Sequence, residues 1–216
     1  MGRAKNGVFG WRNHSMFGLV VAGLLLSSTA VARDGTDAEY LWIQDPWTGE
    51  SVLTAVRAPD YSLWDPTQIS DYQAARNADY PPPLAILTID ALDIQVPVWN
   101  GAEEHVLDRG AGRIKGMAKP GEEGNFGISA HRDSFFRALK DIEQGTEIVV
   151  QTTHGVDRYA VSEIEIVPKH DSSVLELTDD KRLTLVTCYP FYHVGHAPER
   201  YIITALPLLA KAPDGQ

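Results

Sequence analysis

The sequence predicts a mainly β fold, a closed or nearly closed barrel of short strands with a few short helices. After residue 82, short runs rich in Val, Ile, Leu and Thr alternate with turn residues. Only brief stretches there have apolar residues at helical spacing. The chain has 216 residues, 44% of them hydrophobic, which is enough for one well-packed domain with extensions but too little for two large domains.

The N-terminal 32 residues have the features of an export signal. Basic residues precede an uncharged stretch, residues 15–32, whose last residues Ala30-Val31-Ala32 fit a small-residue cleavage site. The same stretch is marginally long enough to be retained as a membrane anchor. In both cases the rest of the chain is expected outside the cytoplasm.

Residues 33–81 are expected to form an extension or linker ahead of the barrel, with little strand alternation. A short helix is expected at residues 70–78, opened by Ser70 and followed by the prolines 81–83, which mark a boundary. The aromatic residues of this extension include Tyr40, Trp42, Trp47, Tyr61 and Trp64.

The barrel is expected over residues 82–209, a normal size for a small domain, with residues 210–216 as a tail. One or two helical turns are expected at 102–108. A helix is expected at 134–142, where apolar residues have helical spacing and Gly145 follows. The expected strands are residues 84–90, 94–99, 124–131, 147–153, 158–167, 182–188 and 200–206.

Charge and cysteine content exclude some classes. The formal net charge of −10 would repel nucleic acid, so a nucleic-acid-binding function is not expected. Cys188 is the only cysteine, which excludes an intramolecular disulfide. In an exported protein a single thiol is a candidate reactive group, although a buried cysteine is also an ordinary small hydrophobic residue.

Three residues at predicted strand ends could act together. His131 and Cys188 each end a strand, and Arg200 begins the strand that returns after Cys188. A thiolate is a nucleophile, an imidazole transfers protons, and a guanidinium donates hydrogen bonds to a developing oxyanion. The trio therefore suits acyl transfer through a thioester. Arg132 and Asp133 are read as a local ion pair or a helix cap.

These residues lie in segments that resemble the sortase family. TLVTC, the upstream ISAHRD and the downstream ERYIITA match its signature in the same order, and the surrounding sequence resembles class D sortases. The resemblance implies an eight-stranded sortase barrel. It also implies that His131, Cys188 and Arg200 are catalytic, and that Thr187, which precedes the cysteine, contributes to substrate binding.

By the same resemblance the reaction is transpeptidation. Cys188 would cleave an LPxTG-like sorting signal of an exported protein after its Thr and hold the N-terminal part as a thioester. An amine, from a cell-wall precursor or from another surface subunit, would then resolve the thioester. The partners implied are sorting-signal-bearing proteins, the amine acceptor and a membrane contacted by the N-terminal segment.

No metal or cofactor is expected. His193 and His196 have i, i+3 spacing but no third ligand at a suitable spacing, so they are read as loop residues near the substrate. Some sortases use calcium, but no clear site is visible among the acidic candidates, which are Glu103, Glu104, Glu122 and Glu123.

The Asp45-Pro46-Trp47 stretch resembles the lid of pilin-building sortases, but class D sortases are not generally lidded and Asp-Pro is a common turn, so turn chemistry is the favoured explanation.

Two other functions stay open at this point. An exported cysteine peptidase would only hydrolyse its thioester, although papain-like enzymes have the cysteine before the histidine and the caspase motif is absent. A non-catalytic surface-binding domain would need Cys188 to be inert.

Overall fold

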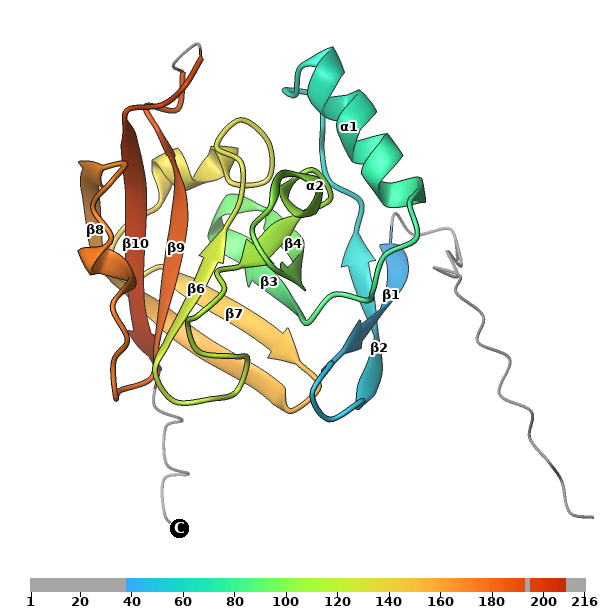
Figure 1. Cartoon of the computed structure of the whole chain (residues 1–216), viewed down its shortest axis with the longest axis horizontal. Coiled ribbons are helices and arrows are strands. Elements are labelled where there is room, and N and C mark those ends of the chain that lie inside the picture. Colours follow the sequence, from blue (N-terminus) through green and yellow to red (C-terminus); the bar gives the residue numbers. More distant parts are fainter. Residues whose placement is uncertain (1–37, 193–194, 209–216) are drawn as a thin grey trace, which may run out of the picture.

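The structure is a computed structural model, and it describes residues 38–192 and 195–208. Within these residues eight strands close into a barrel in the order β10-β8-β7-β3-β4-β5-β6-β9 (Figure 1). The predicted mainly β, closed eight-stranded barrel is therefore confirmed. Its strands are β3 (Ala85–Ile89), β4 (Ile94–Asn100), β5 (Ala111–Arg113), β6 (Asn125–Ser129), β7 (Glu147–Thr152), β8 (Gly155–Pro168), β9 (Arg182–Tyr189) and β10 (Glu199–Pro207).

Strand pairing brings distant parts of the chain together. Strand β9 lies between β6 and β10, parallel to β6 and antiparallel to β10. The three strands expected to carry the histidine, the cysteine and the arginine are thus neighbours.

Alternation along β9 and β10 separates the barrel core from its outer face. Leu183, Leu185 and Ile203 point inward and are fully buried in the main hydrophobic core. Val186 and Ile202 point outward into a smaller cluster, which Val174 and Leu175 cover. Successive residues of a strand point to opposite faces, so Cys188 and Arg200 lie on the outer face.

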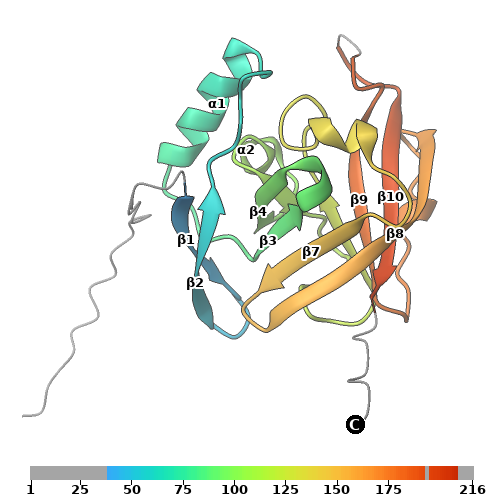
Figure 2. The ribbon, with the colours of Figure 1, turned by 180° about the vertical axis from the view of Figure 1, so that it is seen from behind.

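The residues ahead of the barrel contain a hairpin that sequence reasoning missed. Strands β1 (Ala38–Gln44) and β2 (Ser51–Arg57) pair antiparallel, and their inner residues Ile43 and Val56 pack against Ile86 of β3. Figure 2 shows this hairpin beside the barrel, below α1 (Pro66–Asn77). The outer face carries Trp42 and Leu53, each 49% exposed. Because both faces hold apolar residues, the sequence lacks the polar–apolar alternation that indicates a strand.

Helix α1 begins earlier than expected, because its cap is Asp65 rather than Ser70. The Asp65 carboxylate accepts hydrogen bonds from the backbone N–H groups of Thr67 (2.7 Å) and Gln68 (3.1 Å). Pro66 occupies the first helical position, where its missing N–H costs no hydrogen bond. The helix itself is confirmed.

The other short helices differ in how well they match expectation. α2 (Glu104–Leu107) confirms the expected turn within 102–108. The helix expected at 134–142 is wrong in type, since only a 3₁₀ segment, η2 (Arg137–Asp141), forms there. Phe135 packs edge-on against Trp64, with ring centroids 4.8 Å apart, and lies partly buried against the barrel core that holds Phe136 and Leu139. Two further 3₁₀ turns are η1 (Asp90–Leu92) and η3 (Ser173–Leu175).

Two expectations fall on residues outside the described part of the chain, the signal-like segment 1–32 and the tail 210–216. Across residues 38–192 and 195–208, no helix has both the length and the apolar character needed to cross a bilayer.

Candidate active site

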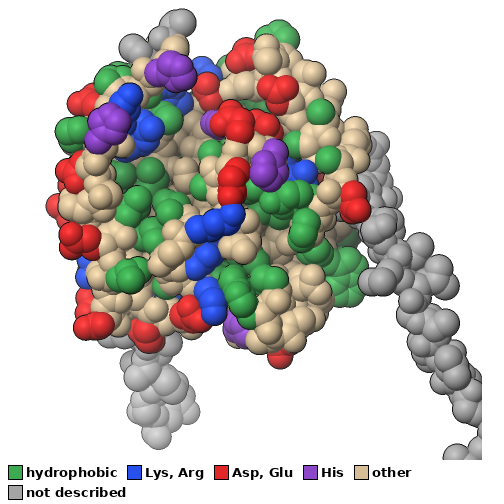
Figure 3. All heavy atoms as spheres, viewed as in Figure 1, with side chains coloured by type: hydrophobic (Ala, Val, Ile, Leu, Met, Phe, Trp, Pro, Cys, Tyr) green, Lys and Arg blue, Asp and Glu red, His purple; other side chains and the backbone are tan. Residues whose placement is uncertain are grey.

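A groove of about 320 Å³ opens on the outer face of the barrel at the ends of β9 and β10. It brings together all three residues of the predicted trio and His196. In Figure 3, acidic side chains gather over α2 on the side of the molecule that is shown, with Lys and Arg side chains beside them. The lining residues are Glu104, His131, Arg132, Asp133, Lys169, Cys188, Gly195, His196, Ala197 and Arg200.

Cys188 and Arg200 face each other across the β9–β10 pair. They are direct partners in the antiparallel register. Directly opposed residues project from the same face with Cβ atoms about 4.5–5.5 Å apart. The Arg200 guanidinium is held through Nη1, which donates to the backbone oxygens of Glu199 (2.9 Å) and Ala197 (3.4 Å). The register of strands β9 and β10 therefore places the side chains of Cys188 and Arg200 on the same face.

His131 reaches the same face from β6. In the parallel β6–β9 register Ser129 is opposite Val186, and the Ala130 N–H continues the pairing by donating to the Val186 oxygen at 3.3 Å. Two residues beyond Ser129 and Val186, the same register puts His131 beside Cys188. His131 follows the end of β6, and Cys188 lies near the end of the neighbouring parallel strand β9.

Thr187 lies on the opposite face from Cys188. Its side chain is 2% exposed, and its hydroxyl donates a 2.8 Å hydrogen bond to the oxygen of Ala130, the residue before His131. It is not among the residues that line the groove. The contact joins the two strand ends that carry the histidine and the cysteine.

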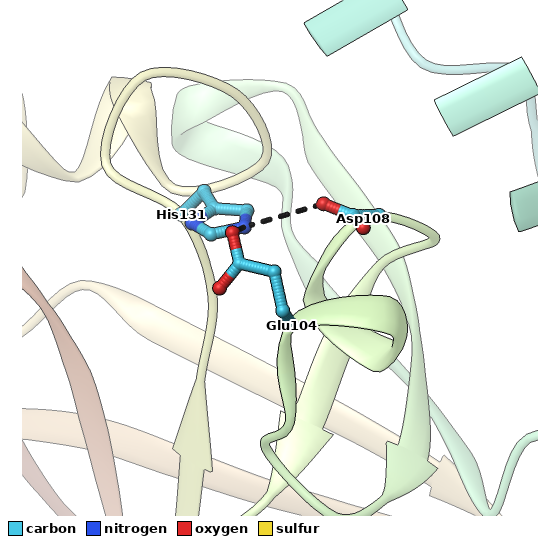
Figure 4. A group of neighbouring side chains, drawn as sticks. All are labelled: Glu104, Asp108 and His131. Carbon is cyan, nitrogen blue, oxygen red and sulfur yellow. Dashed lines mark ion pairs between the residues drawn. The ribbon is translucent and has the colours of Figure 1, made fainter. Parts of the chain in front are cut away.

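His131 also faces two carboxylates that sequence reasoning did not connect with it. Its Nε2 atom lies 3.7 Å from Glu104 Oε1 and 3.7 Å from Asp108 Oδ1 (Figure 4). Burial, followed by the charge of Glu104, raises the pKa of Asp108, whereas the nearby His131 works in the opposite direction. In the sequence, Glu104 and Asp108 are four residues apart on the expected turn and so share a face, but this spacing alone does not indicate a contact with His131.

The loop between β9 and β10 is hydrogen-bonded to Arg132, the residue after His131. Arg132 is buried, and its Nη2 donates to the Gly195 oxygen at 3.1 Å. The reading of Arg132 as a local ion pair or cap therefore misses a contact across 63 residues of sequence. Lys169 joins the same region, since its backbone N–H donates to the Pro198 oxygen at 3.0 Å.

The remaining histidine and carboxylate candidates are placed as follows. His196 is exposed and lines the groove, while His193 lies outside the described residues. Of the four carboxylates considered for calcium, Glu103 pairs with Lys115 and Glu122 pairs with Lys119, so two already have a cationic partner. The oxygen and nitrogen atoms of Glu104, Asp108 and His131 lie within 4.8 Å of one another. Each of the three side chains offers one ligand atom, but exposed carboxylates are common without a metal ion, so we interpret the group as two carboxylates facing a protonatable imidazole.

The Asp45-Pro46-Trp47 stretch forms the turn of the β1–β2 hairpin. Asp45 accepts hydrogen bonds from the Trp47 N–H (2.7 Å) and from His154 Nε2 (2.8 Å). Burial works to raise the pKa of Asp45, but these hydrogen bonds lower it overall. Trp47 lies over Lys119, whose Nζ is 4.7 Å from the ring centroid. No residue of the turn lines the groove.

Trp47→Ala should therefore leave the thiol as accessible as before. We expect the alkylation rate of Cys188 by iodoacetamide to stay within about twofold of wild type, since accessibility and thiolate character set this rate. The rate can be followed by intact mass. An acceleration of about fivefold or more would instead show that the turn covers the cysteine.

Comparison with known proteins defines the class that this fold and groove represent. The sortase domain model matches residues 87–208, which include His131, Cys188 and Arg200. The chain belongs to the sortase family, whose members are cysteine transpeptidases. The rival readings as a hydrolysing peptidase or an inert binding domain are not favoured.

The resemblance to class D sortases is also confirmed. The chain is 35% identical to Sortase D of Bacillus subtilis over 142 residues, which cover 63% of this chain and 72% of that protein. A Clostridium perfringens Sortase D5 transpeptidase structure aligns with a TM-score of 0.55 at 26% identity, covering 65% of this chain and 88% of the other. The catalytic domain of B. anthracis SrtD aligns with a TM-score of 0.51 at 30% identity, covering 58% and 87%.

Proposed function

We propose that this sortase cleaves an LPxTG-like sorting signal at Cys188 and transfers the upstream part to an amine. The observation that carries the proposal is the direct pairing of Cys188 with Arg200 across β9 and β10, in a groove that His131 also lines. A nucleophile, a proton carrier and an oxyanion donor are thereby available on one face.

The first half-reaction forms a thioester. The Cys188 thiolate attacks the carbonyl carbon of the signal's threonine, and the carbonyl oxygen becomes an oxyanion to which Arg200 donates hydrogen bonds. When this tetrahedral intermediate collapses, the bond to the following residue breaks. His131 gives its proton to the departing amine nitrogen.

The second half-reaction reverses these roles. An acceptor amine attacks the thioester carbon while neutral His131 takes a proton from the nitrogen, and Arg200 again faces the oxyanion. The C–S bond then breaks and the thiolate is restored. A new amide has replaced the original one, with no net consumption of water.

The natural partners follow from the same proposal. Sortases act on proteins that carry a sorting signal, and they are generally membrane-anchored or extracytoplasmic. We propose that this chain works outside the cytoplasm, held by residues 15–32, and joins exported proteins to a cell-wall precursor or a surface subunit. Residues 82–209 are the proposed catalytic domain, and the barrel limits of Ala85 and Pro207 support these bounds. His193 and His196 are proposed to contribute to the signal's binding site. Thr187 was expected to do so as well, but its buried hydroxyl is bonded to the Ala130 oxygen, so we propose that it only holds the two strand ends together.

A trapping experiment tests the proposal. The full chain is incubated with an LPxTG-type peptide and hydroxylamine, and the products are identified by mass spectrometry. We expect the threonine hydroxamate, because hydroxylamine is an amine nucleophile that resolves a thioester. Cys188→Ala is the control and should give no product. Free threonine acid alone, even at high hydroxylamine, would identify a hydrolase, and no cleavage across several sorting-type peptides would contradict the proposed specificity.

A further inference from the structure

The two carboxylates at His131 approach the ring from one side. Figure 4 shows Glu104 and Asp108 next to one ring nitrogen, with the other nitrogen on the opposite side of the ring. The nitrogen near the carboxylates is Nε2, at 3.7 Å from each. Nδ1 is therefore the nitrogen that faces away from α2 and remains available for proton transfer.

The two carboxylates differ in how firmly they are held. The Asp108 side chain is 25% exposed and that of Glu104 is 81% exposed. Asp108 caps the C-terminus of α2, with its backbone N–H bound to the Glu104 oxygen at 2.9 Å, and fully buried Val106 anchors this turn to the protein. A fully solvated ion pair contributes little, whereas a partly buried one is screened less. Asp108 is thus the stronger partner.

We infer that Asp108 is a positioning residue for His131, an inference that rests on the proposed function. Its carboxylate holds the imidazole with Nε2 toward α2, which leaves Nδ1 for proton transfer, and it stabilises the positive charge that His131 acquires on taking a proton. Asp108 itself exchanges no proton, in the way that the aspartate of a Ser-His-Asp triad orients its histidine. At 3.7 Å the contact is longer than a hydrogen bond, and such contacts commonly tighten once substrate binds.

The acid side of the pH profile should report this contact. Asp108 faces His131, Glu104 of α2 and Asp71 of α1, and burial followed by the Glu104 charge raises the pKa of Asp108. Asp71 acts in the same direction, and His131 opposes both. As the pH falls, Asp108 therefore takes up a proton at a higher pH than an ordinary aspartate and loses the charge that holds the imidazolium.

The test compares Asp108→Asn with Glu104→Gln, since both substitutions remove one carboxylate at 3.7 Å from the same nitrogen. For Asp108→Asn we expect kcat to fall about tenfold to a hundredfold with KM within about twofold, a typical scale for loss of proton-transfer geometry. The acid-side step that Asp108 sets in the wild-type profile should also be absent from the remaining activity. Glu104→Gln removes a solvated carboxylate that also lines the groove, so it should lower kcat by a clearly smaller factor than Asp108→Asn does. Asp108→Glu should recover most of the lost kcat.

A second readout needs no peptide substrate and separates this inference from the proposed function. The alkylation rate of Cys188 by iodoacetamide at about pH 7 should fall roughly threefold or more in Asp108→Asn and by a clearly smaller factor in Glu104→Gln, since a charged imidazole supports the thiolate. Asp108→Ser should repeat the result if the asparagine variant folds poorly. Failure of hydroxamate formation in wild type contradicts the function alone. Equal effects of the two substitutions, or none from Asp108→Asn, overturn the role of Asp108.

Discussion

Replacing Arg200 by alanine should lower kcat/KM for an LPxTG-type peptide by about two to three orders of magnitude, the usual loss when one oxyanion donor is removed. The guanidinium lies opposite Cys188 in the strand register and is oriented by the oxygens of Glu199 and Ala197. These contacts restrain the guanidinium beside the groove before substrate arrives. Steady-state kinetics of peptide cleavage measure the loss.

Arg200→Lys distinguishes a planar donor from a simple positive charge. Lysine keeps the charge but lacks the guanidinium fork, so it should recover no more than about tenfold of the lost activity. Arg158→Ala is a matched control, since Arg158 lies on the neighbouring strand β8 and forms an exposed pair with Glu147 at 2.7 Å. Kinetics of Arg200→Ala within threefold of the Arg158→Ala control would show that Arg200 only borders the groove.

The sequence predicted the three groove residues because each ends or begins a strand within a recognisable motif. Strand alternation then explains why the thiol is accessible. Leu183 and Leu185 fill the barrel, so Cys188, at the opposite phase of β9, faces outward into the groove. A cysteine one residue earlier, at the position of Thr187, would instead point toward the barrel interior.

The parts that the sequence did not predict depend on tertiary contacts. The position of Asp108 beside His131 results from the way α2 lies against the loop after β6, and two acids four residues apart are too common to indicate it. Strand β5 has only three residues, which is too short to show a period. The sequence did not indicate the β1–β2 hairpin, because its exposed face carries the apolar residues Trp42 and Leu53 and so shows no polar–apolar alternation.

Strand β5 nevertheless sets a strict packing requirement at Gly112. A Cβ atom there would lie 2.0 Å from the Gly101 oxygen, 3.0 Å from the Gly101 carbonyl carbon and 3.1 Å from the Ala102 Cα. All three are backbone atoms, so no side-chain rotation can relieve the clash. The glycine is needed for this close approach, just before α2 and its carboxylates.

Gly112→Ala should therefore destabilise the protein by about 3 kcal/mol or more, at the upper end of the range for overpacking. For a chain of this size that corresponds to a fall in Tm of roughly 6–12 °C. Gly116→Ala is the control, since a Cβ there meets nothing within 4 Å and only its φ of +90° is unfavourable. Such strain costs about 1–2 kcal/mol. Urea unfolding measures the free energy of unfolding of both variants. If Gly112→Ala were as stable as Gly116→Ala, the backbone of the β4–β5 connection would be able to move at little cost in free energy. Since α2 begins three residues after Gly101, the same substitution should also displace Asp108 and lower kcat in the fraction that stays folded.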